Sequence, residues 1–229
     1  ETAIKRFDKP PKVGIDLGCS RGYAAFNRFG NYDHFERILG IDIDSDSLQI
    51  ADKESEKYLA NWTFKKTSLE EPEELAKAIG DFLEGYTEPV LVWSAFVFHF
   101  FKDPMSIFKA LQKLLPVGSV IIIRTLDDLT PVFYPDPDDL LQRVKLSRHS
   151  KFSDAERYHA RKLPFQFIES GLSNPEMISE TVFSSNMNSE EKEIHRYVWF
   201  SFYEQLAVYQ AGQIEDPRER EKFLKEYAE

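Results

Sequence analysis

Two acids and a run of small residues near the start of the chain have the spacing of a site for a nucleotide-like ligand. Asp16 ends an apolar stretch and is followed at once by the small residues Gly18, Ser20 and Gly22. About twenty residues further on, a second apolar stretch ends in Asp42. Small residues let a backbone turn approach a ligand, and the helix behind the turn directs free N–H groups at it. An acid at the end of the second strand can accept hydrogen bonds from both hydroxyls of a ribose.

The acid that precedes the turn distinguishes this pattern from a dinucleotide site. A carboxylate at Asp16 repels a pyrophosphate, but it suits a ligand that carries an amino group and a sulfonium. The loop from Asp16 to Gly22 also lacks the Gly-x-Gly-x-x-Gly spacing of nicotinamide-dependent oxidoreductases. Both features are against a hydride-transfer enzyme.

The elements that must position these residues alternate between strand and helix. Apolar runs such as Val90–Trp93 and Val120–Ile123 are typical of central strands that are buried on both faces. The sequence predicts strands over 12–18, 37–43, 62–68, 90–96 and 119–125, and helices over 21–29, 45–59, 72–83 and 104–115. Asp44 or Ser45 is expected to cap the second helix. This alternation predicts an α/β fold of the Rossmann-like, doubly wound kind, with a mostly parallel sheet and flanking helices.

The pattern changes after Thr125. The stretch 127–139 is rich in prolines and acids, which predicts a loop or a short lid. Pro164 is expected to kink or end a helix near Leu163. The remaining expectations are helices over 140–147 and 154–170, a sixth strand over 177–183 and a helix within 189–210. We expect one domain over 1–229, with a lid or acceptor-binding insertion over 126–165.

The loop and the second strand resemble two motifs of one enzyme family. Asp16-Leu17-Gly18-Cys19-Ser20-Arg21-Gly22 resembles the first motif of class I S-adenosylmethionine-dependent methyltransferases, whose usual form is acid-x-Gly-x-Gly-x-Gly. Gly40-Ile41-Asp42-Ile43-Asp44 resembles their second motif. The stretches 91–104 and 114–125 resemble the fourth strand with its loop and the turn into the fifth strand. The resemblance implies S-adenosyl-L-methionine as cofactor and methyl transfer as activity.

The resemblance also implies roles for particular residues. Asp16 would face the amino group of the cofactor or a bridging water, although an acid that caps the loop is the simpler alternative. Asp42 would bind the ribose hydroxyls and Ile43 would pack on adenine. The other residues implied in cofactor binding are Gly18, Ser20 and Gly22 in the loop, Ser68 and Leu69 at adenine, and Ser94 and Ala95 along the methionine chain.

Three positions depart from the pattern of the family. Ser20 and Val117 stand where the family usually has glycine, and Ser68 stands where it often has aspartate. A Ser68 hydroxyl can accept the adenine bond, but a plain turn after the strand remains open as an alternative. These departures leave room for a non-catalytic S-adenosylmethionine-binding module.

Candidate residues on the acceptor side follow the fourth and fifth strands. His99 is the natural general base or orienter, or it only packs against its neighbours. Asp127 and Asp128 could hold a cationic amine or a hydroxyl-rich acceptor, or they are a solvated pair that caps the loop. The Ser94-Ala95-Phe96 segment lacks the acid that a catechol-type metal site needs, so we expect no metal.

Composition limits the partners. The 229 residues carry a net charge of −10, which is against a nucleic-acid acceptor because phosphate binding requires a basic face. The single cysteine, Cys19, fits a reducing cytoplasm, and no apolar run is long enough to cross a membrane. We expect a cytoplasmic enzyme with a small-molecule methyl acceptor. A protein or peptide acceptor is the alternative, and the oligomeric state stays open.

Overall fold

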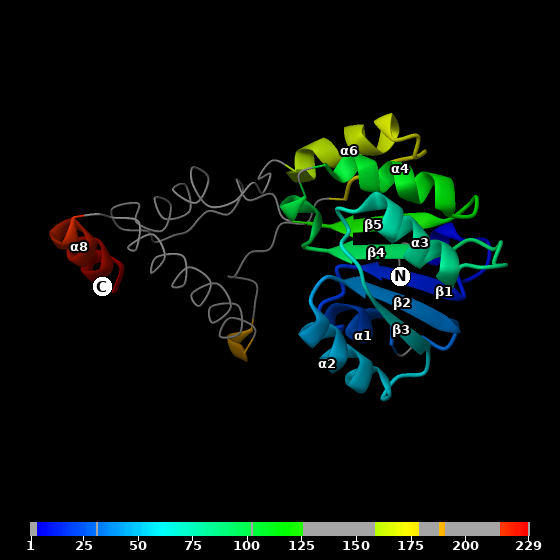
Figure 1. Ribbon diagram of the computed structural model, residues 1–229, viewed down its shortest axis with the longest axis horizontal. Helices are drawn as coiled ribbons and strands as arrows, with labels where there is room; N and C mark the ends of the chain where they lie inside the picture. Colours follow the sequence, from blue (N-terminus) through cyan, green and yellow to red (C-terminus); the bar gives the residue numbers. More distant parts are fainter. Residues whose placement is uncertain are drawn as a thin grey trace. The chain divides into compact units, whose positions relative to one another are not determined.

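The computed structural model describes residues 4–30, 32–101, 103–125, 159–178, 188–190 and 216–228. Contacts divide the chain into two units, one made of residues 1–128 with 154–176 and the other of 129–153 with 177–229. The sheet and its helices belong to the first unit (Figure 1). In the second unit the structure describes residues 177–178 and 188–190 and the charged helix α8 (Pro217–Ala228).

In the described part of the chain, five parallel strands form the sheet, in the order β3-β2-β1-β4-β5 (Figure 1). The strands are β1 (Val13–Leu17), β2 (Arg37–Asp42), β3 (Asn61–Lys66), β4 (Leu91–Ala95) and β5 (Val120–Arg124). Asp16 of β1 lies opposite Gly40 of β2 on one side and Trp93 of β4 on the other. The strand order reverses between β1 and β4, and in open α/β sheets ligands bind outside the strand ends at such a point. The predicted fold class is confirmed.

Helices cover both faces of the sheet, because alternate residues of each strand point to opposite faces. Ile38 and Leu91 pack beneath α1 (Tyr23–Phe29) and α2 (Ser45–Ser55), which contribute Phe26 and Ala51 to that core. Leu39 and Val92 pack on the other face, in a core shared with three helices. These are α3 (Pro72–Phe82), α4 (Pro104–Leu114) and α6 (His159–Glu169).

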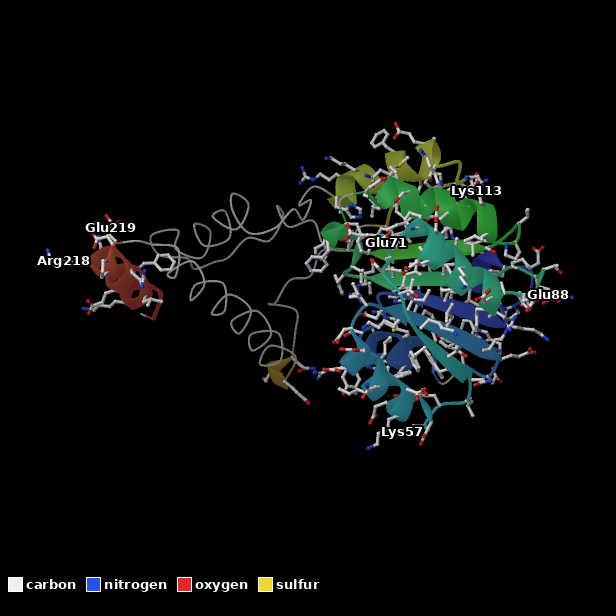
Figure 2. All side chains as sticks on the ribbon, in the orientation of Figure 1. Lys57, Glu71, Glu88, Lys113, Arg218 and Glu219 are labelled. Atoms are coloured by element: carbon white, nitrogen blue, oxygen red, sulfur yellow. The ribbon has the colours of Figure 1, made fainter. Side chains whose placement is uncertain are left out.

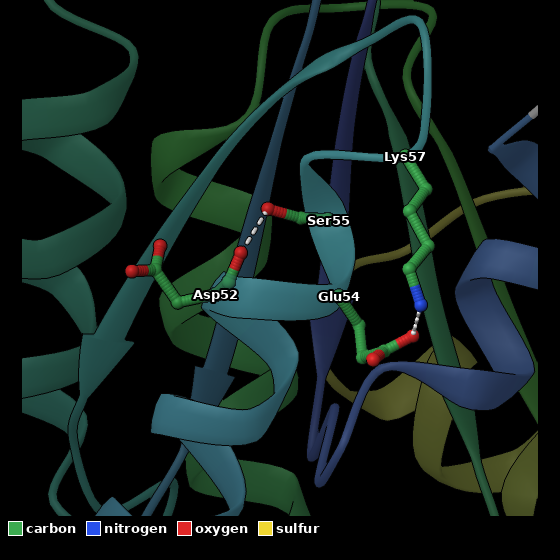
Figure 3. Close-up of polar contacts among 4 residues, drawn as sticks. All are labelled: Asp52, Glu54, Ser55 and Lys57. Atoms are coloured by element: carbon green, nitrogen blue, oxygen red, sulfur yellow. Dashed lines mark hydrogen bonds and ion pairs between the residues drawn. The ribbon is translucent and has the colours of Figure 1, made fainter.

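Helix α2 begins as predicted and ends earlier than predicted. The Asp44 side chain caps it by accepting from Asp46 N at 3.1 Å. Its last turn closes on local contacts, since Ser55 Oγ donates to Asp52 O at 2.6 Å and Lys57 Nζ lies 2.5 Å from Glu54 Oε2 (Figure 3). The backbone N–H groups of residues 57 and 58 then make i to i+3 bonds that end the helix at Ser55. The predicted extension to residue 59 is therefore wrong.

Helix α6 does not end near Leu163, which was one of the two predicted effects of Pro164. It continues to Glu169, although proline removes one backbone donor. Packing on both sides of the proline holds the helix: Leu163 is buried, and the ring of Phe167 meets that of Phe108 edge-on with 4.7 Å between centroids. Tertiary packing here outweighs a local preference.

Several predictions after residue 125 fall mostly outside the described residues. Met177 and Ile178 are not in a strand, and the rest of the predicted sixth strand is not described. The same holds for the predicted helix over 140–147, for most of 189–210 and for residues 126–158 of the predicted lid. The single domain and the lid stay predictions.

Exposed charged side chains surround the first unit. Lys57, Glu88 and Lys113 extend outward from loops and helix ends (Figure 2). No helix in the described part of the chain combines the length and the apolarity that crossing a membrane requires.

Candidate functional site

The loop after β1 is fixed to the end of β2 by its backbone. Gly18 N and Cys19 N both donate to Ile41 O, at 2.8 and 3.0 Å, and Gly22 N donates back to Cys19 O at 2.8 Å. These bonds hold the loop in one conformation before any ligand arrives. The predicted tight turn is therefore a preorganised feature of the strand edge.

Two positions of the loop require glycine. Gly18 and Gly22 have φ angles of 75° and 77°, a region that L side chains rarely adopt. A Cβ atom on Gly18 would lie 2.4 Å from Cγ2 of Val97, and one on Gly22 would lie 2.4 Å from the ring of Phe26. Only glycine at these two positions lets the loop pack against α1 and against the segment that follows β4.

Ser20 adopts the same left-handed region, with a φ of 47°. This is the position at which the sequence departs from the glycine usual in the methyltransferase motif. The exposed serine keeps its backbone N–H directed at Asp42, with 2.7 Å to Oδ2. The structure thus explains why glycine is usual at this position and why a small polar residue also fits it.

A β-branched residue should fail at this position. We expect Ser20→Val to lower the free energy of unfolding by about 1–2 kcal/mol relative to Ser20→Gly, because a branched side chain clashes with the backbone at positive φ. Urea unfolding of the two variants measures the difference. Equal stabilities would show that residue 20 does not hold the left-handed conformation.

The Asp42 carboxylate is oriented by two backbone N–H groups. Ser20 N donates to Oδ2 at 2.7 Å and Asp44 N donates to Oδ1 at 3.0 Å. An ionised carboxylate offers about four lone-pair sites, so acceptor capacity remains for a ligand. Asp42 is half-buried at the strand end, and Ile43 after it is 65% exposed.

Asp16 is a buried acid beneath the same loop. It is 4% exposed, and its pKa is raised to about 7, first by burial and then by the charge of Asp42. A carboxylate in such a place is unfavourable unless a cation or hydrogen-bond donors compensate it. The acid is therefore poised to exchange its proton for a positively charged ligand group.

Cys19 lies within the loop as a packing residue. It is buried, and a Cβ atom on Gly40 would lie 3.0 Å from its Sγ. Burial, followed by the charges of Asp16 and Asp42, raises the pKa of the Cys19 thiol. A neutral thiol is a poor nucleophile, which agrees with a packing role for Cys19.

The turn after β3 reaches the same edge of the sheet. Thr67 N donates to the backbone O of Asp42 at 3.0 Å, which places the predicted adenine residues beside the second motif. Ser68 Oγ accepts from Glu70 N at 3.3 Å, and the side chain of Leu69 is buried in the core. The hydroxyl of Ser68 thus also stabilises its own turn.

Ser94, at the end of β4, makes a bond within the protein. Its side chain is fully buried, and its Oγ donates to Leu17 O at 2.8 Å. The hydroxyl therefore joins the ends of β4 and β1. Ala95 follows it, half-buried, opposite Arg124 of β5.

The segment after β4 carries aromatic residues on the acceptor side. Phe96 has a φ of 60° and is 39% exposed. His99 lies half-buried in the short 3-10 helix η2 (Phe98–Phe100), with its ring centroid 4.0 Å from that of Phe100. Asp127 and Asp128, the other candidates, lie outside the described residues.

Arg124 was missed in the sequence. Its guanidinium carbon lies 5.2 Å from the centroid of the Phe96 ring, at the ends of the adjacent strands β4 and β5. The available signal was a charged residue that ends the otherwise apolar run of β5. Within the described ranges, no group of three or more histidines, cysteines and acids has the arrangement of a metal site.

Comparison of the sequence with known protein families shows which family the chain belongs to. A family described as "Methyltransferase domain" matches residues 8–197, which is most of the chain. The chain belongs to the methyltransferase domain family. This confirms the class I S-adenosylmethionine-dependent methyltransferase that the two motifs indicated. No curated protein matches this methyltransferase significantly.

Two of the similar solved structures share the fold of this methyltransferase at low sequence identity. The cyclopropane synthase MmaA2 from Mycobacterium tuberculosis is 14% identical with a TM-score of 0.54, over 99% of this chain and 74% of that one. A chain of the complex between the Haloferax volcanii Trm112 methyltransferase activator and a methyltransferase is 16% identical, with a TM-score of 0.51 over 86% and 82%. An S-adenosylmethionine-dependent methyltransferase from Mesorhizobium loti is 18% identical with a TM-score of 0.36 over 49% of this chain, and only 45% of its own length is covered.

Proposed function

We propose that this methyltransferase transfers the methyl group of S-adenosylmethionine to a small-molecule acceptor. The observation that carries the proposal is the Asp42 carboxylate, which two backbone N–H groups hold at the end of β2 with acceptor capacity to spare. When bound, the cofactor supplies an electrophilic methyl group on a positively charged sulfur. The residues at the carboxyl ends of the strands would bind the cofactor, align the acceptor and exclude water.

The residues proposed to bind S-adenosylmethionine lie at the carboxyl ends of β1 to β4 and in the loops that follow these strands. Asp42 would accept from the two ribose hydroxyls, and the exposed Ile43 would cover one face of adenine. Asp16, buried and with its pKa near neutrality, would compensate the amino group. The remaining contacts are proposed for the loop residues Gly18, Ser20 and Gly22, for Ser68 and the Leu69 N–H at adenine, and for Ser94 and Ala95 along the methionine chain.

On the acceptor side, the protein has to align the acceptor and exclude water. A general base is required only if the acceptor loses a proton, and His99 is the candidate because it lies beside the end of β4. Asp127 and Asp128 are proposed to bind the acceptor after β5. His99, Asp127 and Asp128 are thus the catalytic residues of the proposal.

Charge supports a small acceptor over a nucleic acid. The net charge of −10 opposes an acceptor that carries many phosphates. A cytoplasmic location, predicted from the single free cysteine, stays part of the proposal.

The proposal predicts where a labelled methyl group goes. We expect the wild-type protein to move label from methyl-labelled S-adenosylmethionine into the small-molecule fraction of a cell extract, and Asp42→Ala to lose this transfer. Asp52→Asn is the matched control, because Asp52 is an exposed acid on α2 whose carboxylate lies away from the neighbouring contacts drawn in Figure 3. Label in protein would indicate a side-chain acceptor, and cofactor binding without any transfer would indicate a non-catalytic module.

A further inference from the structure

Phe96 and Arg124 form a pair at the carboxyl ends of β4 and β5 that the cofactor assignment leaves unused. The backbone joins them, because Phe96 N donates to Arg124 O at 2.8 Å. The side chains meet as well, with the guanidinium carbon 5.2 Å from the ring centroid. A guanidinium over an aromatic face at this distance is a cation–π contact, which fixes the orientation of the arginine.

The backbone of Phe96 adopts an unfavourable conformation. A φ of 60° is rare for a bulky residue and costs on the order of 1 kcal/mol or more. Burial does not account for it, since the side chain is 39% exposed. Strain of this kind is common at binding sites, where the surrounding structure holds a side chain in position for a ligand.

The charge of the pair differs from that of the cofactor half. Asp16 and Asp42 make the ends of β1 and β2 acidic, whereas the described residues 94–101 and 120–125 contain no acid. The next acids after β5, Asp127 and Asp128, lie outside the described residues. Arg124 is exposed, and among the described residues no carboxylate lies within ion-pair distance of it. Arg124 thus places a positive charge at the carboxyl end of β5, on the side of the sheet where ligands bind in open α/β folds.

We propose that Arg124, held on the ring of Phe96, binds a carboxylate of the methyl acceptor. A guanidinium held over a ring still has N–H groups for a ligand, and its planar fork matches a carboxylate with two parallel hydrogen bonds. The exposed ring of Phe96 offers apolar surface beside it. The acceptor is therefore a carboxylic acid with an apolar or aromatic part, and Asp127 and Asp128 would bind an amino or hydroxyl group of the same molecule rather than its carboxylate. This inference rests on the proposed function because it concerns the same site.

Pairs of ligands that differ only in charge test this assignment. With the wild-type protein saturated with S-adenosylhomocysteine, titration calorimetry compares benzoate, 3-phenylpropanoate and octanoate with their neutral amides. We expect at least one acid to bind about tenfold more tightly than its amide, as one charge-assisted contact predicts. Arg124→Gln should abolish the preference, and Arg124→Lys should keep only part of it.

Two further variants separate binding from folding. Phe96→Gly suits the left-handed backbone and removes the ring, so it should weaken the preference for the acid severalfold without loss of stability. Lys113→Gln removes a charge from the exposed end of α4 and should leave the preference unchanged. In Figure 2, the Lys113 side chain lies on the outside of the unit.

Equal binding of every acid and its amide by the wild-type protein would overturn the assignment, as would a preference that survives in Arg124→Gln. Affinity for S-adenosylhomocysteine is measured in each variant and should stay unchanged in Arg124→Gln. If the wild-type protein does not bind S-adenosylhomocysteine at all, the proposed function itself fails. The two failures are thus distinguished by separate titrations.

Discussion

Asp42→Ala is expected to weaken S-adenosylhomocysteine binding at least about a hundredfold. The variant removes the acceptor for two ribose hydroxyls, and each hydrogen bond to a charged group contributes about 1.5–3 kcal/mol. It also removes the acceptor of the Ser20 and Asp44 N–H groups, which hold the loop and the start of α2. The variant therefore loses both its direct contact with the ribose and the bond that orients the loop at Ser20.

Asp42→Asn separates these two contributions. The amide oxygen can still accept from one of the two N–H groups, but the negative charge is gone, so we expect an intermediate affinity. Titration calorimetry gives the affinities, and thermal unfolding confirms that each variant is folded. A change below about threefold in folded Asp42→Ala, similar to that in the Asp52→Asn control, would show that Asp42 does not contact the ligand.

Asp16 should make cofactor binding depend on pH near neutrality. Its pKa in the free protein is about 7, so below that pH the acid is protonated and neutral. An ammonium group beside it stabilises the ionised form, and binding therefore releases a proton. We expect the affinity for S-adenosylhomocysteine to rise about eightfold from pH 6 to pH 7.5, as linkage to one such group requires.

A ligand without the amino group provides the control. Methylthioadenosine keeps the adenine and the ribose but lacks the amino acid chain, so its affinity should not change over this range. Calorimetry at pH 6.5 in two buffers of different ionisation enthalpy counts the protons released. A pH dependence shared by both ligands, or one that persists in Asp16→Asn, would place the titrating group elsewhere.

The same acid should destabilise the free protein above acidic pH. The pKa of Asp16 is about 7 when folded and near its ordinary value of 3.8 when unfolded, so between these pH values the folded state binds more protons. The contribution of this group to the free energy of unfolding therefore falls by on the order of 4 kcal/mol as pH rises from about 4 to about 7. Above pH 7 this contribution is constant. Asp16→Asn should remove this part of the pH dependence in urea unfolding measured at pH 5 and pH 8.

The strand order and the cofactor half of the site follow patterns that are local in sequence. Successive residues of a strand point to opposite faces, so Ile38 packs on one layer of helices and Leu39 on the other. The spacing from Gly22 to Asp42 reflects one helix, one turn and one strand. The cap at Asp44 is also local, because its partner is two residues away. Such features depend on neighbours that the sequence displays.

Other features depend on contacts between distant residues. The hydroxyl of Ser94 bonds to Leu17, which is far away in sequence, so its type alone could not distinguish this tie from a ligand contact. The Phe96–Arg124 pair requires the register of β4 and β5 and an unusual φ, and neither can be read from composition. The segment that follows α2 is also held by a distant contact, because Leu59 N donates to Gly30 O.

The central claim is that the Asp42 carboxylate binds the ribose diol of S-adenosylmethionine at the carboxyl ends of the strands, beside the point where the strand order reverses between β1 and β4. The most direct measurement is a crystal structure of the protein with S-adenosylhomocysteine. We expect both ribose hydroxyls within hydrogen-bond distance of the two Asp42 oxygens, with the amino group beneath the loop that begins at Gly18. Density for the ligand at another edge of the sheet, or with its ribose turned away from Asp42, would contradict the account.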